Sequence, residues 1–245
     1  MSVEITSSSW SNGEVRVEVL YSLAGVSTAI KITSAFTGKM MLLDAGDGAL
    51  RDLLGSGSTD FSDELDLIAL SHGHFDHIGG LYSLLGFMRM ADRKTPLNIL
   101  TPIECSEAIG LVDVFKDLYR ESMPFRITLH ELRSGNGFET DFFGVRAIAV
   151  EHRSYENTPI QDRMTPALGY RVRVGQTVIG YTGDTRYCSG AEDVVRDADL
   201  ALIEATYDSS PDGVPVAHLL EDEARSLGSL AKRFMLIHRK PPVPL

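Results

Sequence analysis

The chain has 245 residues, of which 43% are hydrophobic, and it carries a formal net charge of −11. This size and composition are typical of a soluble globular protein, and no apolar run approaches the ~18 residues that a transmembrane helix requires. The acidic balance disfavours tight binding to nucleic acid, because proteins that bind phosphate backbones usually present a surface rich in lysine and arginine.

The start of the chain and its cysteines indicate a compartment. Residues 1–6 lack the basic and then apolar layout of a secretory signal, and Cys105 and Cys188 follow no pairing or metal-binding pattern. These features predict a cytoplasmic protein with no membrane partner. Because no linker rich in proline, glycine or serine divides the chain, we expect a single domain over residues 1–245.

Hydrophobic alternation predicts the elements of the first half of the chain. Strands are expected at 15–20, 29–33, 39–43, 65–70 and 97–100. Asp44-Ala-Gly-Asp-Gly48 follows the third strand and precedes a short helix. An amphipathic helix is expected to begin near Ile78, and another helix is expected over 106–119.

The same patterns continue in the second half. Strands are expected at 126–132, 145–150, 167–174, 177–181, 200–203 and 235–237, and a helix at 222–234. Only nine residues, 172–180, separate Arg171 from Tyr181, which leaves room for a plain hairpin. Strands with interspersed helices predict an α/β (α+β) protein in which helices cover sheets in layers.

Three imidazoles and one carboxylate are concentrated in one turn, between the strand at 65–70 and the next helix. They are His72, His74, Asp76 and His77. Imidazole nitrogen and carboxylate oxygen suit zinc and similar divalent ions, and the thiolates that close most structural zinc sites are absent. The turn therefore predicts an open, catalytic metal site, with a polar turn of hydrogen-bonded histidines as the alternative.

Three more candidate ligands follow predicted strands. His152, Asp184 and His238 each come at or just after a strand end, where loops commonly assemble active sites. Each of them alone is more typical of a structural histidine or a turn aspartate.

Five segments together resemble the metallo-β-lactamase superfamily over nearly the whole chain. They are Asp44-Ala-Gly-Asp-Gly48, His72-x-His-x-Asp-His77, His152, Gly183-Asp184-Thr185 and His238. The resemblance implies a metallo-β-lactamase-type αββα four-layer sandwich that binds two divalent metal ions, Zn²⁺ first, with Mn²⁺ or Fe as alternatives.

The resemblance also assigns the ligands. The implied ligands of the first ion are His72, His74 and His152. The implied ligands of the second are Asp76, His77 and His238, with Asp184 as the bridge. Asp44 is implied to orient a ligand by hydrogen bonding, its alternative being a solvated turn carboxylate.

Within the superfamily, the chain is most similar to ribonuclease Z and its smaller phosphodiesterase relatives. The segments that carry this likeness are Leu168-Gly-Tyr-Arg171, Tyr181-Thr-Gly-Asp-Thr185, Ile203-Glu-Ala-Thr206 and Ala217-His218. It implies that His218 is the general acid, that Asp76 orients the attacking water and that Glu204 supports the site. The chain departs from the family pattern at Ile203, which replaces a histidine, and the hairpin at 172–180 leaves no room for the arm with which ribonuclease Z holds tRNA.

These patterns predict a binuclear phosphodiesterase for small, cyclic or nucleotide-type phosphodiesters. The expected partner is a small-molecule or short nucleotide substrate, tRNA is disfavoured, and a homodimer is possible. Two alternatives stay open: a hydrolase of a lactone, thioester or β-lactam, and a non-catalytic module that binds a metal or nucleotide. Alternatively, His218 is a structural histidine at the start of a helix with its hydrogen bonds satisfied, and Glu204 is a buried residue paired with a basic neighbour.

Overall fold

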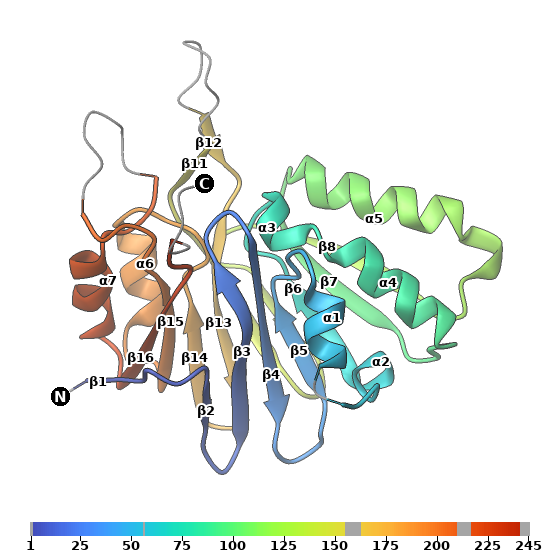
Figure 1. Ribbon diagram of the computed structural model, residues 1–245, viewed down its shortest axis with the longest axis horizontal. Helices are drawn as coiled ribbons and strands as arrows, with labels where there is room; N and C mark the ends of the chain where they lie inside the picture. Colours follow the sequence, from blue (N-terminus) through green and yellow to red (C-terminus); the bar gives the residue numbers. More distant parts are fainter. Residues whose placement is uncertain (1, 56, 155–162, 210–216, 241–245) are drawn as a thin grey trace. The chain divides into compact units, whose positions relative to one another are not determined.

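The computed structural model describes residues 2–55, 57–154, 163–209 and 217–240 (Figure 1). The chain divides into two compact units. Unit 1 consists of residues 1–7 and 133–245, and unit 2 consists of residues 8–132. Each unit contains one seven-stranded mixed sheet with helices packed on it.

In unit 2 the strands follow the chain order across the sheet. They are β2 (Ser9–Ser11), β3 (Val15–Leu23), β4 (Ser27–Ser34), β5 (Met40–Leu43), β6 (Leu65–Ala69), β7 (Leu97–Pro102) and β8 (Ile127–Leu132). The pairings from β2 to β5 are antiparallel and those from β5 to β8 are parallel. The carboxyl ends of β5 and β6 therefore lie at the same edge of the sheet.

The helices of unit 2 come between these strands. They are α1 (Ala49–Leu54), α2 (Phe61–Glu64), α3 (Phe75–Ile78), α4 (Leu81–Met90), α5 (Ser106–Leu118) and the short 3-10 helix η1 (Arg120–Ser122). Leu81, Leu84, Leu85 and Met88 recur at helical spacing along α4 and are fully buried, as is Phe115 of α5. This apolar stripe packs the helices on the sheet and forms the core of the unit.

One buried arginine of unit 2, Arg93, links two connecting segments of the chain through hydrogen bonds to their main-chain carbonyls. Arg93 is fully buried, and its guanidinium donates hydrogen bonds of 2.6–2.8 Å to four main-chain carbonyls. The acceptors are the carbonyls of Ser62, Leu65, Thr95 and Pro96. Burial lowers the pKa of Arg93 to about 10. Since these bonds join carbonyls at or just before the start of β6 to carbonyls just before β7, Arg93 stabilises the beginnings of two neighbouring strands, one of which leads into the histidine-rich turn.

The sheet of unit 1 also combines parallel and antiparallel strands, but its strands do not follow the chain order. Its strands, in sheet order, are β1 (Val3–Glu4), β16 (Arg233–Ile237), β15 (Leu200–Glu204), β14 (Thr177–Tyr181), β13 (Leu168–Val174), β10 (Gly144–Ala149) and β9 (Gly137–Glu139). The pairings from β1 to β14 are parallel, and the remaining three are antiparallel. β11 (His152–Ser154) and β12 (Arg163–Thr165) form a separate two-stranded ribbon.

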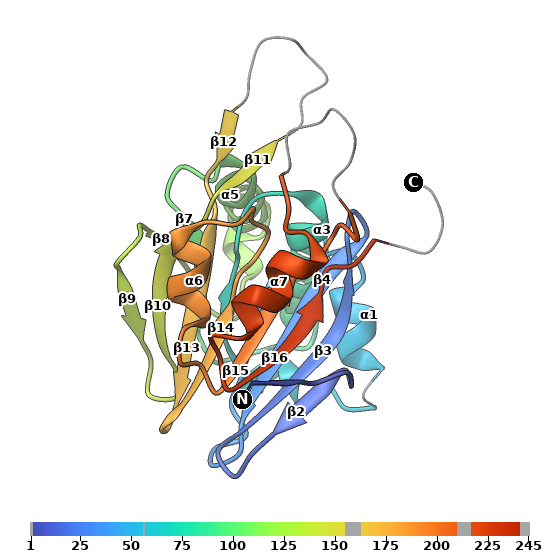
Figure 2. The same ribbon diagram turned by 90° about the vertical axis from the view of Figure 1, so that its left-hand side faces the viewer.

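Two helices cover the sheet of unit 1, as Figure 2 shows in front of β14 to β16. They are α6 (Ser189–Val195) and α7 (Glu221–Gly228). Ala191, Val194 and Val195 of α6 and Ala224 and Leu227 of α7 are fully buried in one apolar cluster. This apolar cluster packs the two helices against one face of the parallel strands.

The predicted helix over 222–234 is too long. The helix α7 ends at Gly228, and residues 233 and 234 belong to β16. A Cβ on Gly228 would lie 2.6 Å from the ring of Phe234, so the chain turns back closely at this glycine. The predicted plain hairpin is confirmed, since Val174 pairs with Thr177 where β13 turns into β14.

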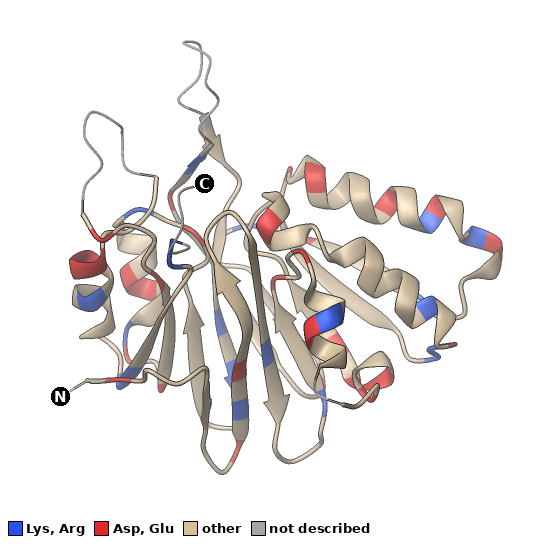
Figure 3. Cartoon of the chain, in the orientation of Figure 1, with Lys and Arg blue, Asp and Glu red and all other residues tan. Residues whose placement is uncertain are grey.

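Both signs of charge occur along the outer helices, as Figure 3 shows for α5. Opposite charges meet in exposed ion pairs such as Arg120 with Asp117 and Arg196 with Glu192. In the part of the chain that the structure describes, no helix has the length and apolar character needed to cross a membrane.

Candidate metal centre

The first cluster of candidate ligands lies at the strand ends of unit 2. Asp44 follows β5 directly, and Ser71 follows β6 after one residue. Because β5 and β6 are parallel neighbours, both residues lie at the same sheet edge, where open sheets commonly place their ligands. His74 is the N-cap of α3, so the histidine-rich turn is held between a buried strand and a helix.

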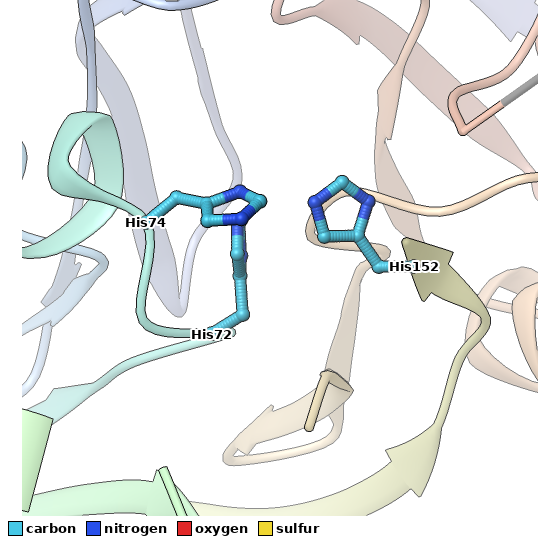
Figure 4. Close-up of side chains that lie close together, drawn as sticks. All are labelled: His72, His74 and His152. Atoms are coloured by element: carbon cyan, nitrogen blue, oxygen red, sulfur yellow. The ribbon is translucent and has the colours of Figure 1, made fainter. Parts of the chain in front are cut away.

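The histidine rings of this cluster are in contact with one another. The ring centroid of His72 lies 4.6 Å from that of His74 and 4.1 Å from that of His77. The rings of His72 and His74 are nearly perpendicular, as Figure 4 shows. Asp76 Oδ2 accepts a hydrogen bond from the main-chain N–H of Gly25 at 2.8 Å and lies 3.7 Å from Nε2 of His77. The turn thus brings together all four residues that the sequence predicts for it.

Asp44 orients this cluster through hydrogen bonds to Ser71 and His77. It is fully buried, so it is not a solvated turn carboxylate. Its Oδ1 accepts from Ser71 N at 2.6 Å, and its Oδ2 accepts from Ser71 Oγ at 2.7 Å and from His77 Nδ1 at 2.6 Å. Asp44 has φ = 59°, a left-handed conformation that aspartate tolerates better than most residues. This backbone conformation directs the carboxylate toward Ser71 and His77.

The second cluster lies at the strand ends of unit 1. Asp184 follows β14, Glu204 ends β15, and His238 follows β16 with φ = 53°. β14, β15 and β16 are parallel neighbours, which explains why residues far apart in sequence meet at one sheet edge. His152, also labelled in Figure 4, begins β11.

His218 stands at the middle of the unit 1 cluster. Its ring centroid lies 5.1 Å from that of His152 and 5.6 Å from that of His238, and its Nδ1 lies 3.7 Å from Asp184 Oδ2. Potential ligand atoms of His152, Asp184 and His218 lie within 4.8 Å of one another, and the same holds for Glu204, His218 and His238. The loop before His218, at 210–216, lies outside the described residues.

Glu204 connects residues of the unit 1 cluster through hydrogen bonds. The carboxylate is buried, and its Oε1 accepts from Thr185 N and from His218 Nδ1, both at 2.9 Å. Its Oε2 accepts from Thr206 Oγ1 at 2.8 Å and from Thr206 N at 3.2 Å. His218 is therefore the basic neighbour of Glu204. The same carboxylate also bonds to Thr185, the residue after Asp184.

Sequence reasoning missed two hydroxyl groups in these clusters. Ser71 Oγ lies 3.0 Å from His72 Nδ1, and Thr206 Oγ1 lies 2.9 Å from His238 Nδ1. Both residues stand inside motifs that the sequence displays, directly before His72 and at the end of Ile203-Glu-Ala-Thr206. Their positions in these motifs mark the two residues, although the contacts with Asp44 and His238 join segments that are far apart in sequence.

The donor groups fit divalent metal ions. Nδ1 of His77, His72 and His238 each has a protein oxygen at 2.6–3.0 Å, and Nδ1 of His152 has the carbonyl of Ala217 at 3.4 Å. An imidazole that donates from Nδ1 carries its lone pair on Nε2, which is the arrangement expected for metal-ligating histidines. The nitrogen and oxygen donors of both clusters suit Zn²⁺ and similar ions.

Comparison with known proteins places the chain in a family. Residues 40–238 match the model of the β-lactamase superfamily domain, and the chain belongs to this family. Ribonuclease Z from Pyrococcus abyssi is 27% identical over 260 residues, which cover 88% of this chain and 80% of that protein. The predicted superfamily and the predicted hydrolase class are confirmed.

Solved structures confirm the fold. The metallo-β-lactamase fold protein YhfI from Bacillus subtilis aligns with a TM-score of 0.73 and 20% identity, over 95% of this chain and 89% of that chain. The short form of human tRNase Z aligns with a TM-score of 0.73 and 22% identity, over 91% of this chain and 92% of that chain. The chain therefore has the metallo-β-lactamase fold.

Proposed function

We propose that residues 1–245 act as one hydrolase domain, a binuclear metal-dependent phosphodiesterase for small, cyclic or nucleotide-type phosphodiesters. The observation that carries this proposal is the 2.9 Å contact between His218 Nδ1 and Glu204 Oε1. A carboxylate that holds a histidine in this way prepares a proton donor for a basic leaving oxygen, which phosphodiesters have. The similarity to ribonuclease Z, named for nuclease activity, supports the same reaction class.

The metal ligands are proposed from the order of the family motifs. We assign His72, His74 and His152 to the first ion, and Asp76, His77 and His238 to the second, with Asp184 as the bridge. When bound, a pair of divalent ions lowers the pKa of water and neutralises charge on phosphate oxygens. Zn²⁺ is the expected metal, because the donors are imidazole nitrogens and carboxylate oxygens.

The protein side chains divide the remaining work. The Asp76 carboxylate accepts a hydrogen bond from the attacking water and orients it toward phosphorus, while the Gly25 N–H holds that carboxylate in place. The His218 ring, fixed through Nδ1 by Glu204, presents Nε2 and donates its proton to the leaving oxygen. His218 is only partly buried, so a substrate is able to reach it.

The substrate is proposed to be small. The turn between β13 and β14 is a tight hairpin, and the net charge of −11 opposes long-range attraction to a polyanion. A short nucleotide or a small cyclic phosphodiester meets neither obstacle. We therefore expect poor processing of precursor tRNA at physiological salt. A cytoplasmic location and a homodimer stay predictions of the sequence.

A substrate panel tests the proposed function. The metal-replete chain is assayed with bis(p-nitrophenyl) phosphate, a cyclic nucleotide, a lactone series and a thioester series, and the matched control is the His74→Ala variant. We expect hydrolysis of the phosphodiesters that is lost in the variant. Faster turnover of a lactone or thioester would reassign the chain to carboxylic substrates. Metal binding without turnover of any substrate would make it a non-catalytic module.

A further inference from the structure

Thr206 connects the carboxylate of Glu204 to His238. The hydroxyl Oγ1 of Thr206 lies 2.8 Å from Glu204 Oε2 and 2.9 Å from His238 Nδ1, and all three residues are buried. Thr206 Oγ1 also lies 3.0 Å from the main-chain carbonyl of His238. Thr206 belongs to the segment Ile203-Glu-Ala-Thr206, and the mechanism above gives it no part.

The chemistry of the groups fixes the direction of these bonds. The Thr206 hydroxyl has a single proton and two neighbours that only accept, Glu204 Oε2 at 2.8 Å and the carbonyl of His238 at 3.0 Å, so it acts as the donor in both contacts and the shorter one is to Glu204. The lone pairs of the same oxygen then accept the proton of His238 Nδ1. One carboxylate thus orients two histidines, His218 directly and His238 through a hydroxyl.

Unit 2 contains the same arrangement, built from different residues. Asp44 Oδ2 accepts from His77 Nδ1 directly and from Ser71 Oγ at 2.7 Å, and Ser71 Oγ lies 3.0 Å from His72 Nδ1. Each unit therefore has a buried carboxylate, one histidine bound to it, and a second histidine joined to it by a hydroxyl. The recurrence in an unrelated stretch of sequence indicates a functional requirement for the hydroxyl and not incidental packing.

We propose that Thr206 is a positioning residue that locks the ring of His238 with its proton on Nδ1 and its lone pair on Nε2. The role of His238 as a metal ligand rests on the proposed function, whereas the ring orientation does not. Asp184 Oδ1 lies 3.4 Å from the same Nδ1, a longer contact than the 2.9 Å to Thr206 Oγ1.

Three variants isolate the hydroxyl. Thr206→Val keeps the branched shape and removes the oxygen, and Thr206→Ser keeps the oxygen and removes a methyl group. Thr182→Val is the matched control, because Thr182 is a fully buried threonine whose hydroxyl bonds to main-chain atoms of Gly183 and Glu204 and not to a histidine. Circular dichroism and thermal unfolding establish that each variant is folded.

The first readout needs neither metal nor substrate. Long-range ¹⁵N–¹H correlation spectra of the metal-free protein, in alkaline buffer where imidazole is neutral, report the tautomer of His238. We expect the Nδ1–H form in the wild type, in Thr206→Ser and in Thr182→Val, and a mixture of tautomers in Thr206→Val. A pure Nδ1–H form in Thr206→Val would overturn the proposal.

The second readout is metal affinity, measured by competition with a chromogenic chelator. Removing groups that orient metal ligands typically weakens binding by about 10–100-fold. We expect a loss of this size for Thr206→Val and a change below about threefold for Thr206→Ser and Thr182→Val. Equal affinity in Thr206→Val and wild type would refute the positioning role. If the wild type bound no metal, the proposed function would fail, while the tautomer measurement would still decide the role of Thr206.

Discussion

Nδ1 of His218 lies 2.9 Å from Oε1 of Glu204, a carboxylate whose two oxygens each accept two hydrogen bonds from the protein. Such a buried carboxylate, with all four of its bonds made, is held in place, and it fixes the orientation of the ring that bonds to it. The contact therefore gives His218 a defined orientation.

Removing this ring should have an effect that depends on the leaving group. His218→Ala should slow hydrolysis of an alkyl phosphodiester by about 10²–10⁴-fold, since the alkoxide needs a proton as it departs. The same variant should hydrolyse an ester with an unprotonated p-nitrophenolate leaving group almost as fast as the wild type. Steady-state rates on both substrates, with elemental analysis of the metal, measure the difference.

The matched control for this prediction is His130→Ala. His130 lies in β8, bonds to Asn98 Oδ1 through Nε2 and belongs to neither cluster. It should change neither rate. Equal losses on the two substrates in His218→Ala would assign that ring to substrate positioning, and a loss of metal would make it a ligand.

Asp44→Asn should weaken metal binding. The amide keeps the shape and tolerates the left-handed backbone at φ = 59°, but its charge is gone, and its NH₂ group cannot accept from His77. We expect the affinity for Zn²⁺, determined by chelator competition, to fall by about 10–100-fold. Asp47→Asn, an exposed aspartate in the same segment, is the control. An unchanged affinity in Asp44→Asn would show that the carboxylate does not support a ligand.

Arg93→Ala should strongly destabilise unit 2. The change leaves four carbonyls without their donor, and the bonds to two of them, those of Ser62 and Leu65, are fully buried. Each lost partner of a buried polar group typically costs about 1–3 kcal/mol before relaxation and water entry. We expect a loss on the order of 3 kcal/mol in the free energy of unfolding, measured by urea denaturation. Arg120→Ala removes an exposed ion pair with Asp117 and should cost less than about 1 kcal/mol. Similar values for the two variants would contradict the structural role of Arg93.

Acid should remove a small contribution from Glu221. Hydrogen bonds from Arg225, and then from Arg239, hold the pKa of this carboxyl below its usual value. A carboxyl whose folded pKa is depressed stabilises the fold above its unfolded pKa, and this contribution disappears as pH falls through the folded pKa. Glu221→Gln should therefore be less stable than the wild type at neutral pH, by less than about 1 kcal/mol because the pair is exposed. Thermal unfolding at several pH values should show the gap closing in acid, and a gap that widened there would refute this account.

The elements that carry the candidate ligands could be predicted because each combines two strong signals. Residues 65–70 are apolar except for Asp66, and His72 follows after Ser71; His238 comes directly after the apolar residues 235–237. Buried strands are visible as apolar runs, and polar residues after them fall at a sheet edge. Short pieces escaped prediction because β1, β2 and the ribbon of β11 and β12 have only two or three residues each, too few to show a period.

The hydroxyl contacts could not be predicted for a different reason. Ser71 meets Asp44 across 27 positions, and Thr206 meets His238 across 32. Such contacts depend on which strands become neighbours in the sheet, and β5 with β6 and β15 with β16 are pairings that only the tertiary structure reveals. Local propensity carries no information about them.

The central proposal is that the chain binds two metal ions, and metal stoichiometry tests it most directly. The wild type and Asp184→Ala are purified without chelator, saturated with Zn²⁺, freed of excess metal and examined by elemental analysis. The account predicts two equivalents of metal per chain in the wild type and a reduced content of both ions in Asp184→Ala, since Asp184 is the proposed bridge. A wild-type content that stays at or below one equivalent under these conditions would contradict it.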